Sequence, residues 1–319
     1  MNVMLNVFLI IIGVAILALS SNWSIIYLKK VAKSLNVHDI IIGLTITSVG
    51  TSLPEIFTNV SAALAGNNGA LGASNIAIGN IIGSCASQIT IIVGIVALYG
   101  TLKPKDRTIT RDGSIMVLAA VIMYGVSLTG RVVSQIEGLI MVCLYIGYII
   151  WIIKAEKKLK SEIKHTGKWS TTLLNIVISL VFIGIVVLSA RVVLDNSLDV
   201  AQALGVSSLI IGLMIGLGTS LPELAISISA IKSRNIGISV GDLIGSNITD
   251  PLLSLGIGAM VAKNGFAVDS TALWFDFPFW IVSAILTLLI FHQYKTMRKG
   301  FAIMLIIIYI TYMVAHFFL

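Results

Sequence analysis

Two acidic residues stand inside long apolar stretches of the chain, and each directly follows a proline. Glu55 ends the string Gly-Thr-Ser-Leu-Pro-Glu that begins at Gly50, and Glu223 ends the same six residues beginning at Gly218. An ionisable side chain within an apolar span costs about 2.5–3.5 kcal/mol on insertion scales, so it should face a cavity or a partner. All 21 Lys and Arg residues lie near the ends of apolar stretches, which leaves the glutamates without a basic partner. We therefore expect the two carboxylates to meet a cation, either a metal ion or protons.

The residues around the glutamates supply oxygen atoms, which are the ligands of hard cations. Because proline lacks an N–H group, Pro54 and Pro222 should interrupt their helices and free the carbonyl groups of Gly50 and Gly218. Four hydroxyl side chains lie in the same turns, on Thr51, Ser52, Thr219 and Ser220. Ca²⁺ takes about six to eight oxygen ligands in proteins. His and Cys are absent from these motifs, which argues against zinc or copper as the substrate.

A second motif follows each glutamate. Residues 79–84 read Gly-Asn-Ile-Ile-Gly-Ser, and residues 241–246 read Gly-Asp-Leu-Ile-Gly-Ser. Asp242, Ser246 and Asp250 are spaced by four residues and so share one face of a helix. Their counterparts in the first half are Asn80, Ser84 and Gln88. The two glutamates and Asp250 would bring three carboxylates against one divalent ion.

The sequence allows two roles for Asp242. At a rise of about 1.5 Å per residue it lies about 6 Å along the helix axis from Ser246. We expect it to cap the helix or lie in a loop near the cytoplasm; as an alternative, it lines the ion pathway with Asn80 and Asn247. Pro251 should interrupt this helix as well and free the carbonyl group of Asn247.

The composition places the chain in a membrane. Of its 319 residues 57% are hydrophobic and only 11% are charged, whereas a soluble domain carries about 25% charged residues. Most of the apolar stretches approach the roughly 20 residues that cross about 30 Å of hydrocarbon. We expect ten helical spans, at 5–19, 40–65, 74–99, 113–129, 136–153, 172–195, 203–231, 237–261, 272–291 and 300–318. Short alternating segments typical of spanning strands are absent, so the predicted fold is an all-α integral membrane protein with broken helices at its centre.

The repeated motifs divide the chain into two halves. Each pair of motifs falls on the second and third spans of a set of five, and because five is odd the second half must enter the membrane from the opposite side. We predict a five-helix repeat at 1–153 with its motifs at 43–94, a linker at 154–170, and an inverted five-helix repeat at 171–319 with its motifs at 211–258. In transporters built from inverted repeats, the binding site lies at the repeat interface.

The basic residues predict the orientation. With ten spans, all of the Lys and Arg residues except Arg131, Arg191 and Lys263 fall on one side. The positive-inside rule makes that side cytoplasmic. We therefore expect a multi-pass plasma-membrane protein with both termini outside and the central loop in the cytoplasm. The net charge of +7 sets the topology and requires no nucleic-acid partner.

The paired motifs, with Gly-Ser-Cys-Ala-Ser-Gln at 83–88 and Gly-Ser-Asn-Ile-Thr-Asp at 245–250, resemble the α-repeats of the calcium/cation antiporter superfamily. Within it they look most like the prokaryotic sodium/calcium exchangers. The resemblance implies that Glu55 and Glu223 bind Ca²⁺ with carbonyl groups near Ser48 and Gly216. The remaining Ca²⁺ and Na⁺ ligands it implies are Thr51, Ser52, Ser84, Thr219, Ser220, Ser246 and Asp250.

The chain departs from the pattern of this family at three places. Gln88 stands where the family usually has Asn, which leaves the amide but lengthens the side chain. Asp242 also replaces an Asn and adds an acidic group for a proton or a cation. The stretch from Gly212 to Gly218 is one residue shorter than its counterpart in the first half, which puts the role of the Gly216 carbonyl in doubt.

The sequence favours a carrier over other classes of protein. The leading hypothesis is Na⁺/Ca²⁺ exchange by alternating access in a functional monomer, and the alternatives are a H⁺/Ca²⁺ antiporter and a cation channel. We expect no enzyme and no cofactor, because the four histidines lie at span ends or in loops and form no constellation with a Ser or Asp. Cys85 and Cys143, both inside spans, should be free thiols.

Overall fold

The computed structural model describes residues 3–35, 39–69, 72–104, 108–159, 169–203, 217–316 and 318, and almost all of them are helical. The predicted helical fold is therefore confirmed for these residues. The sequence did not predict a small antiparallel strand pair, in which β1 (Val132–Val133) bonds to β2 (Phe266–Ala267) and joins two turns. Both cysteines are free thiols, with Cys85 buried and Cys143 exposed.

The helices follow one another with short connections. Those before the central linker are α1 (Val3–Leu35), α2 (Asp39–Ile42), η1 (Gly43–Thr47), α3 (Ser48–Thr51), α4 (Leu53–Asn67), α5 (Ala73–Ser87), η2 (Gln88–Ile92), α6 (Val93–Tyr99), η3 (Ile109–Gly113), α8 (Ser114–Leu128) and α9 (Gln135–Leu159). Those after it are α10 (Trp169–Ala203), α12 (Leu221–Lys232), α13 (Ile236–Thr249), η4 (Asp250–Ser254), α14 (Leu255–Val261), η5 (Ala272–Asp276), α15 (Phe277–Tyr294) and α16 (Lys299–Ala315). The η segments are π-helical turns.

The predicted spans coincide with helices, but their number is not confirmed. Six described helices are long and apolar enough to cross a membrane, and a seventh span results if the bent pair 40–51 and 53–67 is counted as one. Helix α16 is apolar but shorter. Two boundaries were predicted wrongly: the first helix runs on to Leu35 instead of ending at 19, and helix α9 continues to Leu159, inside the predicted linker. Of the span predicted at 203–231, residues 204–216 lie outside the described part of the chain.

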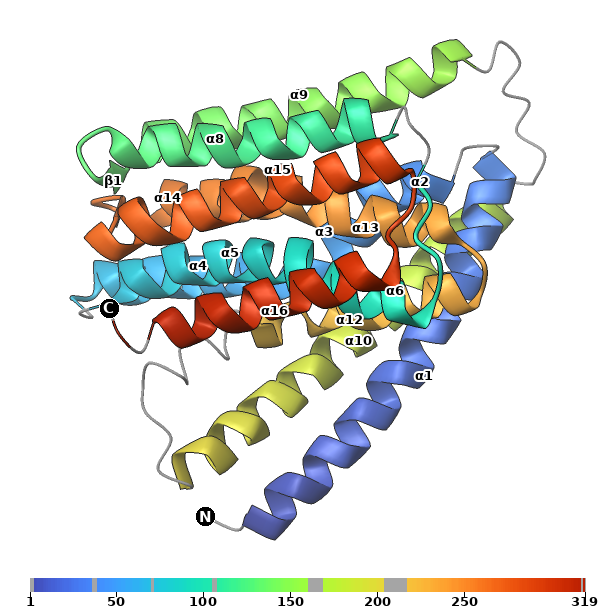
Figure 1. Ribbon diagram of the computed structural model, residues 1–319, viewed down its shortest axis with the longest axis horizontal. Helices are drawn as coiled ribbons and strands as arrows, with labels where there is room; N and C mark the ends of the chain where they lie inside the picture. The colour runs from blue at the N-terminus through green and yellow to red at the C-terminus, as the bar shows by residue number, and fades with distance from the viewer. Residues whose placement is uncertain are drawn as a thin grey trace.

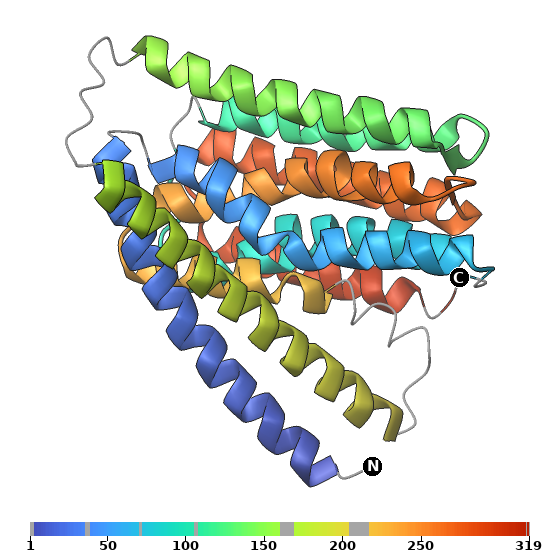
Figure 2. The ribbon, with the colours of Figure 1, turned by 180° about the vertical axis from the view of Figure 1, so that it is seen from behind.

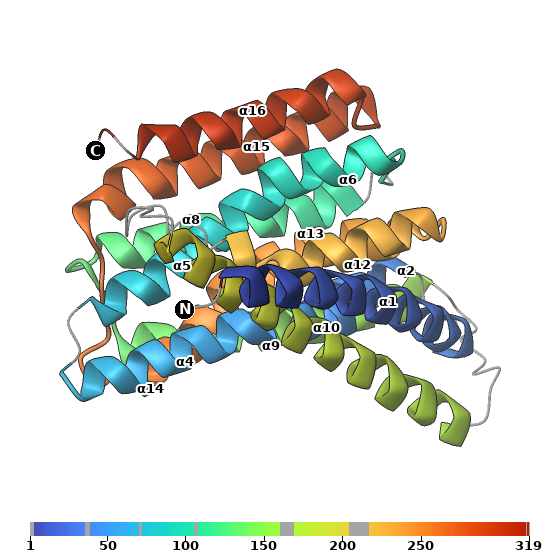
Figure 3. The same cartoon turned by 90° about the horizontal axis from the view of Figure 1, so that it is seen from below.

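The helices form a bundle with one pair standing out from it. Helices α8 and α9 lie along one face, and α15 packs against α8 (Figure 1; Figure 3 shows the same elements from below). Helix α16 lies away from α8 and α9 and packs against α6 and η2. The two longest helices, α1 and α10, lie side by side and run obliquely across the remainder (Figure 2). This pair contacts the bundle mainly through α12 and the segments around α3. The helices that carry the repeated motifs are therefore packed between the oblique pair and the outer helices.

The π-helical turns repeat along the chain in the same way as the motifs. The turn η2 begins at Gln88 and the turn η4 at Asp250, positions that are equivalent in the two copies of the second motif. Pro251 suggested that the helix is interrupted after Asp250, but the structure has no interruption there. The π-helical turn η4 accommodates the proline, and α13, η4 and α14 follow one another directly. Such turns are frequent at functional sites.

Glycine residues allow the first motif segment to cross the second motif helix at backbone contact. A Cβ atom at Gly43 would lie 2.5 Å from the carbonyl oxygen of Ile238, and one at Gly241 would lie 2.5 Å from the carbonyl oxygen of Ile40. A Cβ atom at Gly245 would meet the side chain of Ser48 at 2.8 Å. No other residue fits at these positions without displacement of the backbone. The crossing brings the hydroxyl groups of the first motif against the acidic face of α13.

Candidate cation-binding site

Both copies of the Gly-Thr-Ser-Leu-Pro-Glu motif break the helix at the same residue. The break falls at Ser52 in the first copy, where the helix bends by 41°, and at Ser220 in the second. The two serines have nearly the same backbone angles, with φ/ψ of −78°/6° and −90°/6°. In each copy the proline occupies the first turn of the following helix, where its missing N–H leaves no bond unmade. Each glutamate therefore sits in the first turn of a new helix, fully buried in the bundle.

Each glutamate contacts the serine of the second motif from its own half. Ser84 Oγ donates to Glu55 Oε1 at 3.2 Å, and Ser246 Oγ donates to Glu223 Oε1 at 3.4 Å. The contacts between the two halves are also duplicated. Each threonine of the first motif donates to the side chain at the second position of the other half's second motif. These two bonds are Thr51 Oγ1 to Asp242 Oδ1 at 3.2 Å and Thr219 Oγ1 to Asn80 Oδ1 at 3.1 Å.

Ser84 lies at the centre of the site. Its hydroxyl group is 3.0 Å from Asp250 Oδ2 and 3.0 Å from Ser220 Oγ, in addition to its contact with Glu55. Gln88 Nε2 donates to Ser84 Oγ at 2.9 Å and to Asp250 Oδ2 at 3.2 Å. A hydroxyl group has one hydrogen and can donate to only one of the two carboxylates at a time. The negative charges of Glu55 and Asp250 are therefore incompletely compensated by their neighbours.

Several oxygen atoms of the site have no hydrogen-bond partner among the described residues. They are Ser52 Oγ, Glu55 Oε2, Glu223 Oε2 and Asp250 Oδ1, and all four residues are fully buried. Buried polar atoms are normally bonded, and an unsatisfied charged one is especially costly. Three of these atoms belong to carboxylates and can only accept, so the partner they lack is a cation or a hydrogen donor.

Basic side chains do not provide that partner within the described part of the chain. Arg111 pairs with Asp112 and His316 with Asp276, whereas no Lys or Arg forms an ion pair with the carboxylates of the motifs. The carboxylate of Glu55 instead lies within electrostatic range of those of Glu223 and Asp250. An unpaired group of acids deep in a bundle is characteristic of an ion pathway.

The three carboxylates do not converge as closely as the sequence suggested. No three His, Cys, Asp or Glu side chains of the described residues lie close enough together to hold one metal ion by themselves. The expectation of three carboxylates directly against one ion is therefore not met in this conformation. The physical reason is that hydroxyl groups lie between the acids, as Ser84 does between Glu55 and Asp250.

Comparison with known proteins identifies the class to which this arrangement belongs. The family model described as sodium/calcium exchanger protein matches residues 5–154 and 174–318. The chain belongs to the sodium/calcium exchanger family. The residues left unmatched between the two ranges overlap the predicted linker.

Relatives in this family span nearly the whole chain. The sodium/calcium exchanger MaX1 of Methanosarcina acetivorans is 25% identical, with 98% of this chain and 99% of its own covered. A membrane protein of Methanocaldococcus jannaschii is 30% identical over 78% of this chain and 80% of its own. A solved structure of the sodium-calcium exchanger NCX_Mj, soaked with 10 mM Na⁺ and zero Ca²⁺, superposes with a TM-score of 0.81. It is 26% identical, and 97% of this chain and 98% of that chain are covered. As a sodium/calcium exchanger family member, the chain is a multi-pass membrane protein that transports inorganic cations, and its family is one of transporters.

Three other residues selected from the sequence remain to be described in this exchanger-family protein. Ser48 Oγ is bonded to the carbonyl oxygen of Leu44 at 3.1 Å, and its own carbonyl oxygen accepts the backbone N–H of Ser52. The Ser48 carbonyl oxygen thus accepts a helical hydrogen bond and keeps its second lone pair for a further ligand. Asn247 Nδ2 donates to Gln88 Oε1 at 2.8 Å and so holds the amide of Gln88 in place. Gly216 lies outside the described residues.

Two sequence expectations were wrong. Asp242 neither caps a helix nor lies in a loop, because it sits in the middle of α13, fully buried and bonded to Thr51. His316 does contact an aspartate, since its Nε2 atom lies 2.8 Å from Asp276 Oδ1, which also accepts the hydroxyl group of Tyr312 at 2.9 Å. This cluster joins η5 to the end of α16, and the hydrogen bonds of Asp276 described here include no serine.

Sequence reasoning also missed several polar residues one helical turn from the acids. Asn59 follows Glu55 by four residues and donates to Ser254 Oγ at 2.9 Å. Ser227 follows Glu223 by four residues and contacts Asp242 Oδ2 at 3.5 Å. Asn59 and Ser227 occupy equivalent places in the two motif helices, so the repeat offset could have found both. Nothing in the sequence indicates the contact of Tyr145 with Thr249 at 3.1 Å.

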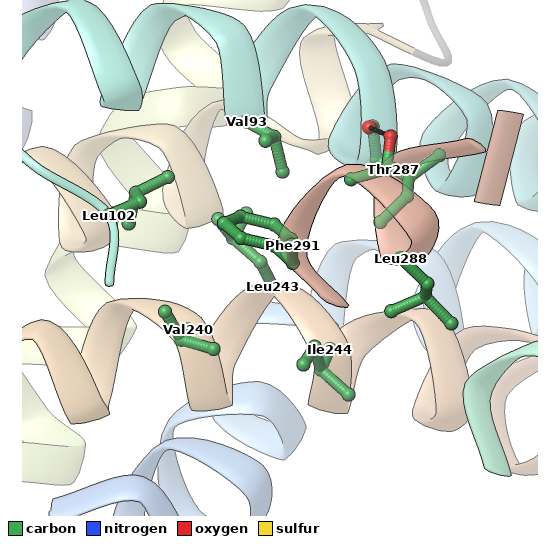
Figure 4. Close-up of a pocket in the computed structure, with 9 residues that line it drawn as sticks. Val93, Leu102, Val240, Leu243, Ile244, Thr287, Leu288 and Phe291 are labelled. Carbon is green, nitrogen blue, oxygen red and sulfur yellow. Dashed lines mark hydrogen bonds between the residues drawn. The ribbon is translucent and has the colours of Figure 1, made fainter. Parts of the chain in front are cut away.

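A separate pocket near the site is apolar. It lies between η2 and α6 on one side and α13 and α15 on the other, with Phe291 and Leu243 facing its interior (Figure 4). The hydroxyl group of Thr287, a polar side chain in this lining, donates to the carbonyl oxygen of Ile89 at 3.0 Å. This pocket therefore offers no ligand set for a cation, in contrast to the polar site around Ser84.

Proposed function

We propose that the chain exchanges Na⁺ for Ca²⁺ across the membrane at the site formed by the two copies of its motifs. The observation that carries the proposal is the set of buried carboxylate oxygens on Glu55, Glu223 and Asp250 that lack a partner among the described residues. Carboxylate, hydroxyl and amide oxygens are the ligands that Ca²⁺ uses, and Ca²⁺ requires several of them. The relatives named for sodium/calcium exchange give the same cations independently.

The proposed ligands fall into two groups. Glu55, Glu223 and Asp250 supply negative charge, and uncharged oxygens come from Thr51, Ser52, Ser84, Gln88, Thr219, Ser220 and Ser246, with carbonyl groups near Ser48 and Gly216. Asn80, Asn247 and Asp242 line the route to this centre. Because the hydroxyl groups separate the acids in this conformation, binding of a divalent ion should draw the three carboxylates together. A set of Na⁺ ions would neutralise them at separate positions.

Exchange follows if one site serves both ions in turn. The same carboxylates cannot hold Ca²⁺ and a full set of Na⁺ simultaneously, so entry of one ion expels the other. Two halves of inverted orientation can exchange their conformations, which gives two nearly equivalent states that open to opposite sides of the membrane. This is the basis of alternating access in transporters with inverted repeats. We place both termini outside, the central loop in the cytoplasm, and the functional unit as a monomer in the plasma membrane.

The experiment that tests the proposal is Ca²⁺ flux in proteoliposomes. We expect Ca²⁺ uptake into Na⁺-loaded vesicles, and we expect Glu55→Gln and Glu223→Gln to abolish it. Asp269→Asn, which changes an exposed carboxylate outside the site, is the matched control and should transport normally. Uptake at the wild-type rate in both glutamine variants would remove this site from the mechanism.

A second candidate, H⁺/Ca²⁺ exchange, is favoured by one observation. Asp242 adds a fourth carboxylate to the buried acids of the repeated motifs, where the first half has the uncharged Asn80. The two candidates separate when a pH gradient replaces the Na⁺ gradient in the same vesicles. Ca²⁺ uptake that requires Na⁺ inside and ignores the pH gradient supports Na⁺ coupling, and the reverse result supports H⁺ coupling. Flux that is saturable and requires a counter-ion, rather than a conductance, distinguishes both from a channel.

A further inference from the structure

A group of residues outside the motifs extends the duplication to the last two helices of each half. Asp112 and Asp276 lie in η3 and η5, the π-helical turns that precede α8 and α15. Tyr148 lies on α9 and Tyr312 on α16, the final helices of the two halves. Both residues of the second half follow their counterparts by 164 positions, close to the offset of 162 between the copies of the second motif. The constant spacing makes the two Asp–Tyr pairs equivalent.

The two equivalent pairs are in different states. In the second half Tyr312 donates its hydroxyl group to Asp276 Oδ1 at 2.9 Å. In the first half Asp112 lies within electrostatic range of Tyr148, yet the buried hydroxyl group of Tyr148 has no hydrogen-bond partner among the described residues. Arg111 bonds to both carboxylate oxygens of Asp112, at 2.7 and 3.0 Å. Because a carboxylate has about four lone-pair sites, these bonds leave room for a hydroxyl group.

A second pair of tyrosines shows the opposite difference. Tyr145 on α9 and Tyr309 on α16 are also 164 positions apart, and both are buried. Here the residue of the first half is bonded, since Thr249 Oγ1 donates to the Tyr145 hydroxyl oxygen at 3.1 Å. The hydroxyl group of Tyr309 forms no hydrogen bond with the described residues, and Ser87, the counterpart of Thr249, bonds to the carbonyl oxygen of Ser84 instead. On α9 the first tyrosine is bonded and the second is not, whereas on α16 the order is reversed.

We propose that the bonding pattern of these four tyrosines reverses when the cation site opens to the opposite side of the membrane. The hydroxyl groups of Tyr148 and Tyr309 then gain hydrogen bonds, and those of Tyr312 and Tyr145 lose theirs. Inverted halves exchange their conformations between the two states, so a difference between equivalent residues in one state should be mirrored in the other. A buried tyrosine hydroxyl group normally has a partner, which Tyr148 finds in the second state. This switch rests on the alternating access proposed above.

The two tyrosine helices pack directly on the cation site. Helix α9 packs against η4, which begins at Asp250, and α16 packs against η2, which begins at Gln88. Thr249, the partner of Tyr145, directly precedes Asp250, and its hydroxyl group lies 3.4 Å from Ser48 Oγ. A change in the bonds of either helix therefore reaches the centre of the site.

Ca²⁺ self-exchange in proteoliposomes tests the switch, because radioactive Ca²⁺ outside replaces Ca²⁺ inside by alternation alone and needs no Na⁺. Tyr148→Phe removes a hydroxyl group that has no partner in this conformation, so its thermal unfolding midpoint should not fall. Its exchange rate should drop by about fivefold, because the opposite state loses one hydrogen bond. Tyr312→Phe should lower the midpoint by roughly 2 °C and also slow the exchange.

The double variant separates a switch from a structural role. Since each substitution weakens a different state, Tyr148→Phe combined with Tyr312→Phe should restore the balance and exchange Ca²⁺ faster than either single variant. Tyr124→Phe, which removes a tyrosine hydroxyl group from α8 outside these pairs, is the matched control and should exchange at the parent rate. Should Tyr312→Phe fail to fold, His316→Gln takes its place, because it removes the other bond to Asp276.

Exchange at the parent rate in Tyr148→Phe, or losses that simply add in the double variant, would overturn the switch. A parent chain that exchanges Ca²⁺ but ignores Na⁺ would refute the proposed Na⁺ coupling and leave the switch intact. A parent chain that carries no Ca²⁺ would remove the alternating access on which the switch rests.

Discussion

Gln88 and Asp250, which occupy the same position in the two copies of the repeat, are hydrogen-bonded to each other at 3.2 Å. Their contact therefore joins the two copies of the repeated motif at the centre of the site. The amide of Gln88 also donates to Ser84 Oγ and accepts from Asn247 Nδ2 at 2.8 Å.

Removal of the Gln88 amide should disturb both stability and transport. Gln88→Ala leaves Asn247 Nδ2 without this acceptor and removes one of the donors to Asp250, so we expect a loss of about 1–3 kcal/mol in unfolding free energy. Ca²⁺ flux should also fall. Gln88→Asn, which retains the amide, is the matched control and should lose less of both. Thermal unfolding and proteoliposome flux measure the two effects, and a Gln88→Ala protein as stable and active as the parent would contradict this role.

Neutralisation of Asp250 should affect Ca²⁺ more than Na⁺. Asp250→Asn preserves the shape of the side chain but removes one of the charges that a divalent ion needs, and ligand charge sets the affinity of Ca²⁺ sites. We expect the Ca²⁺ dissociation constant to rise by about tenfold or more, and the Na⁺ affinity to change less. Isothermal titration calorimetry measures both constants. An equal loss for the two ions would indicate that Asp250 acts on the fold and not on ion charge.

The glycine crossing provides a matched pair of variants at equivalent positions of the repeat. At Gly241 a Cβ atom would lie 2.5 Å from the carbonyl oxygen of Ile40, whereas at Gly79 it would meet nothing within 4 Å. Gly241→Ala should therefore destabilise the protein by about 1–3 kcal/mol, because the backbone must move apart. Gly79→Ala should be neutral or stabilising by up to about 1 kcal/mol, since Ala is the better helix former. The two variants are compared by thermal unfolding. Equal unfolding midpoints would contradict the close approach of the two backbones at Gly241.

The predicted orientation is accessible to cysteine labelling. In a background with Cys85 and Cys143 replaced by Ala, Ser161→Cys in the predicted cytoplasmic linker should react with an impermeant thiol reagent only in inside-out vesicles. Lys263→Cys, at one of the three basic residues assigned to the other side, should react only in right-side-out cells. Labelling of both positions from the same side would contradict the three spans predicted between them.

The sequence supplied most of the candidate site but little of its geometry. Repetition of the motifs singled out Glu55, Glu223 and Ser84, and the missing basic partners followed from the positions of Lys and Arg. The assignment of Asp242 to a cap failed because a helix end and a buried mid-helix position look alike when the span boundaries are uncertain. The π-helical turn at Asp250 could not be predicted either. Pro251 predicts an interrupted helix, and only the packing around it determines which backbone conformation accommodates the proline.

The contacts between the halves depend on how far each helix is shifted and rotated against its neighbours. Local sequence patterns do not contain that information. Thr51 meets Asp242 because Gly43 and Gly241 let their segments touch, a relationship between residues far apart in the chain. The pairing of His316 with Asp276 was missed for the same reason.

Helices α1 and α10 contain 33 and 35 residues, which corresponds to about 50 Å each at the α-helical rise. The hydrocarbon layer is only about 30 Å thick, so a pair of this length has to lean steeply or project into the headgroups. Figure 2 shows that the pair does run obliquely to the bundle. Because its two members contact each other far more than they contact the other helices, a thicker or thinner lipid layer should alter their lean before it strains the rest of the molecule. We therefore expect lipid chain length to act selectively on these two helices.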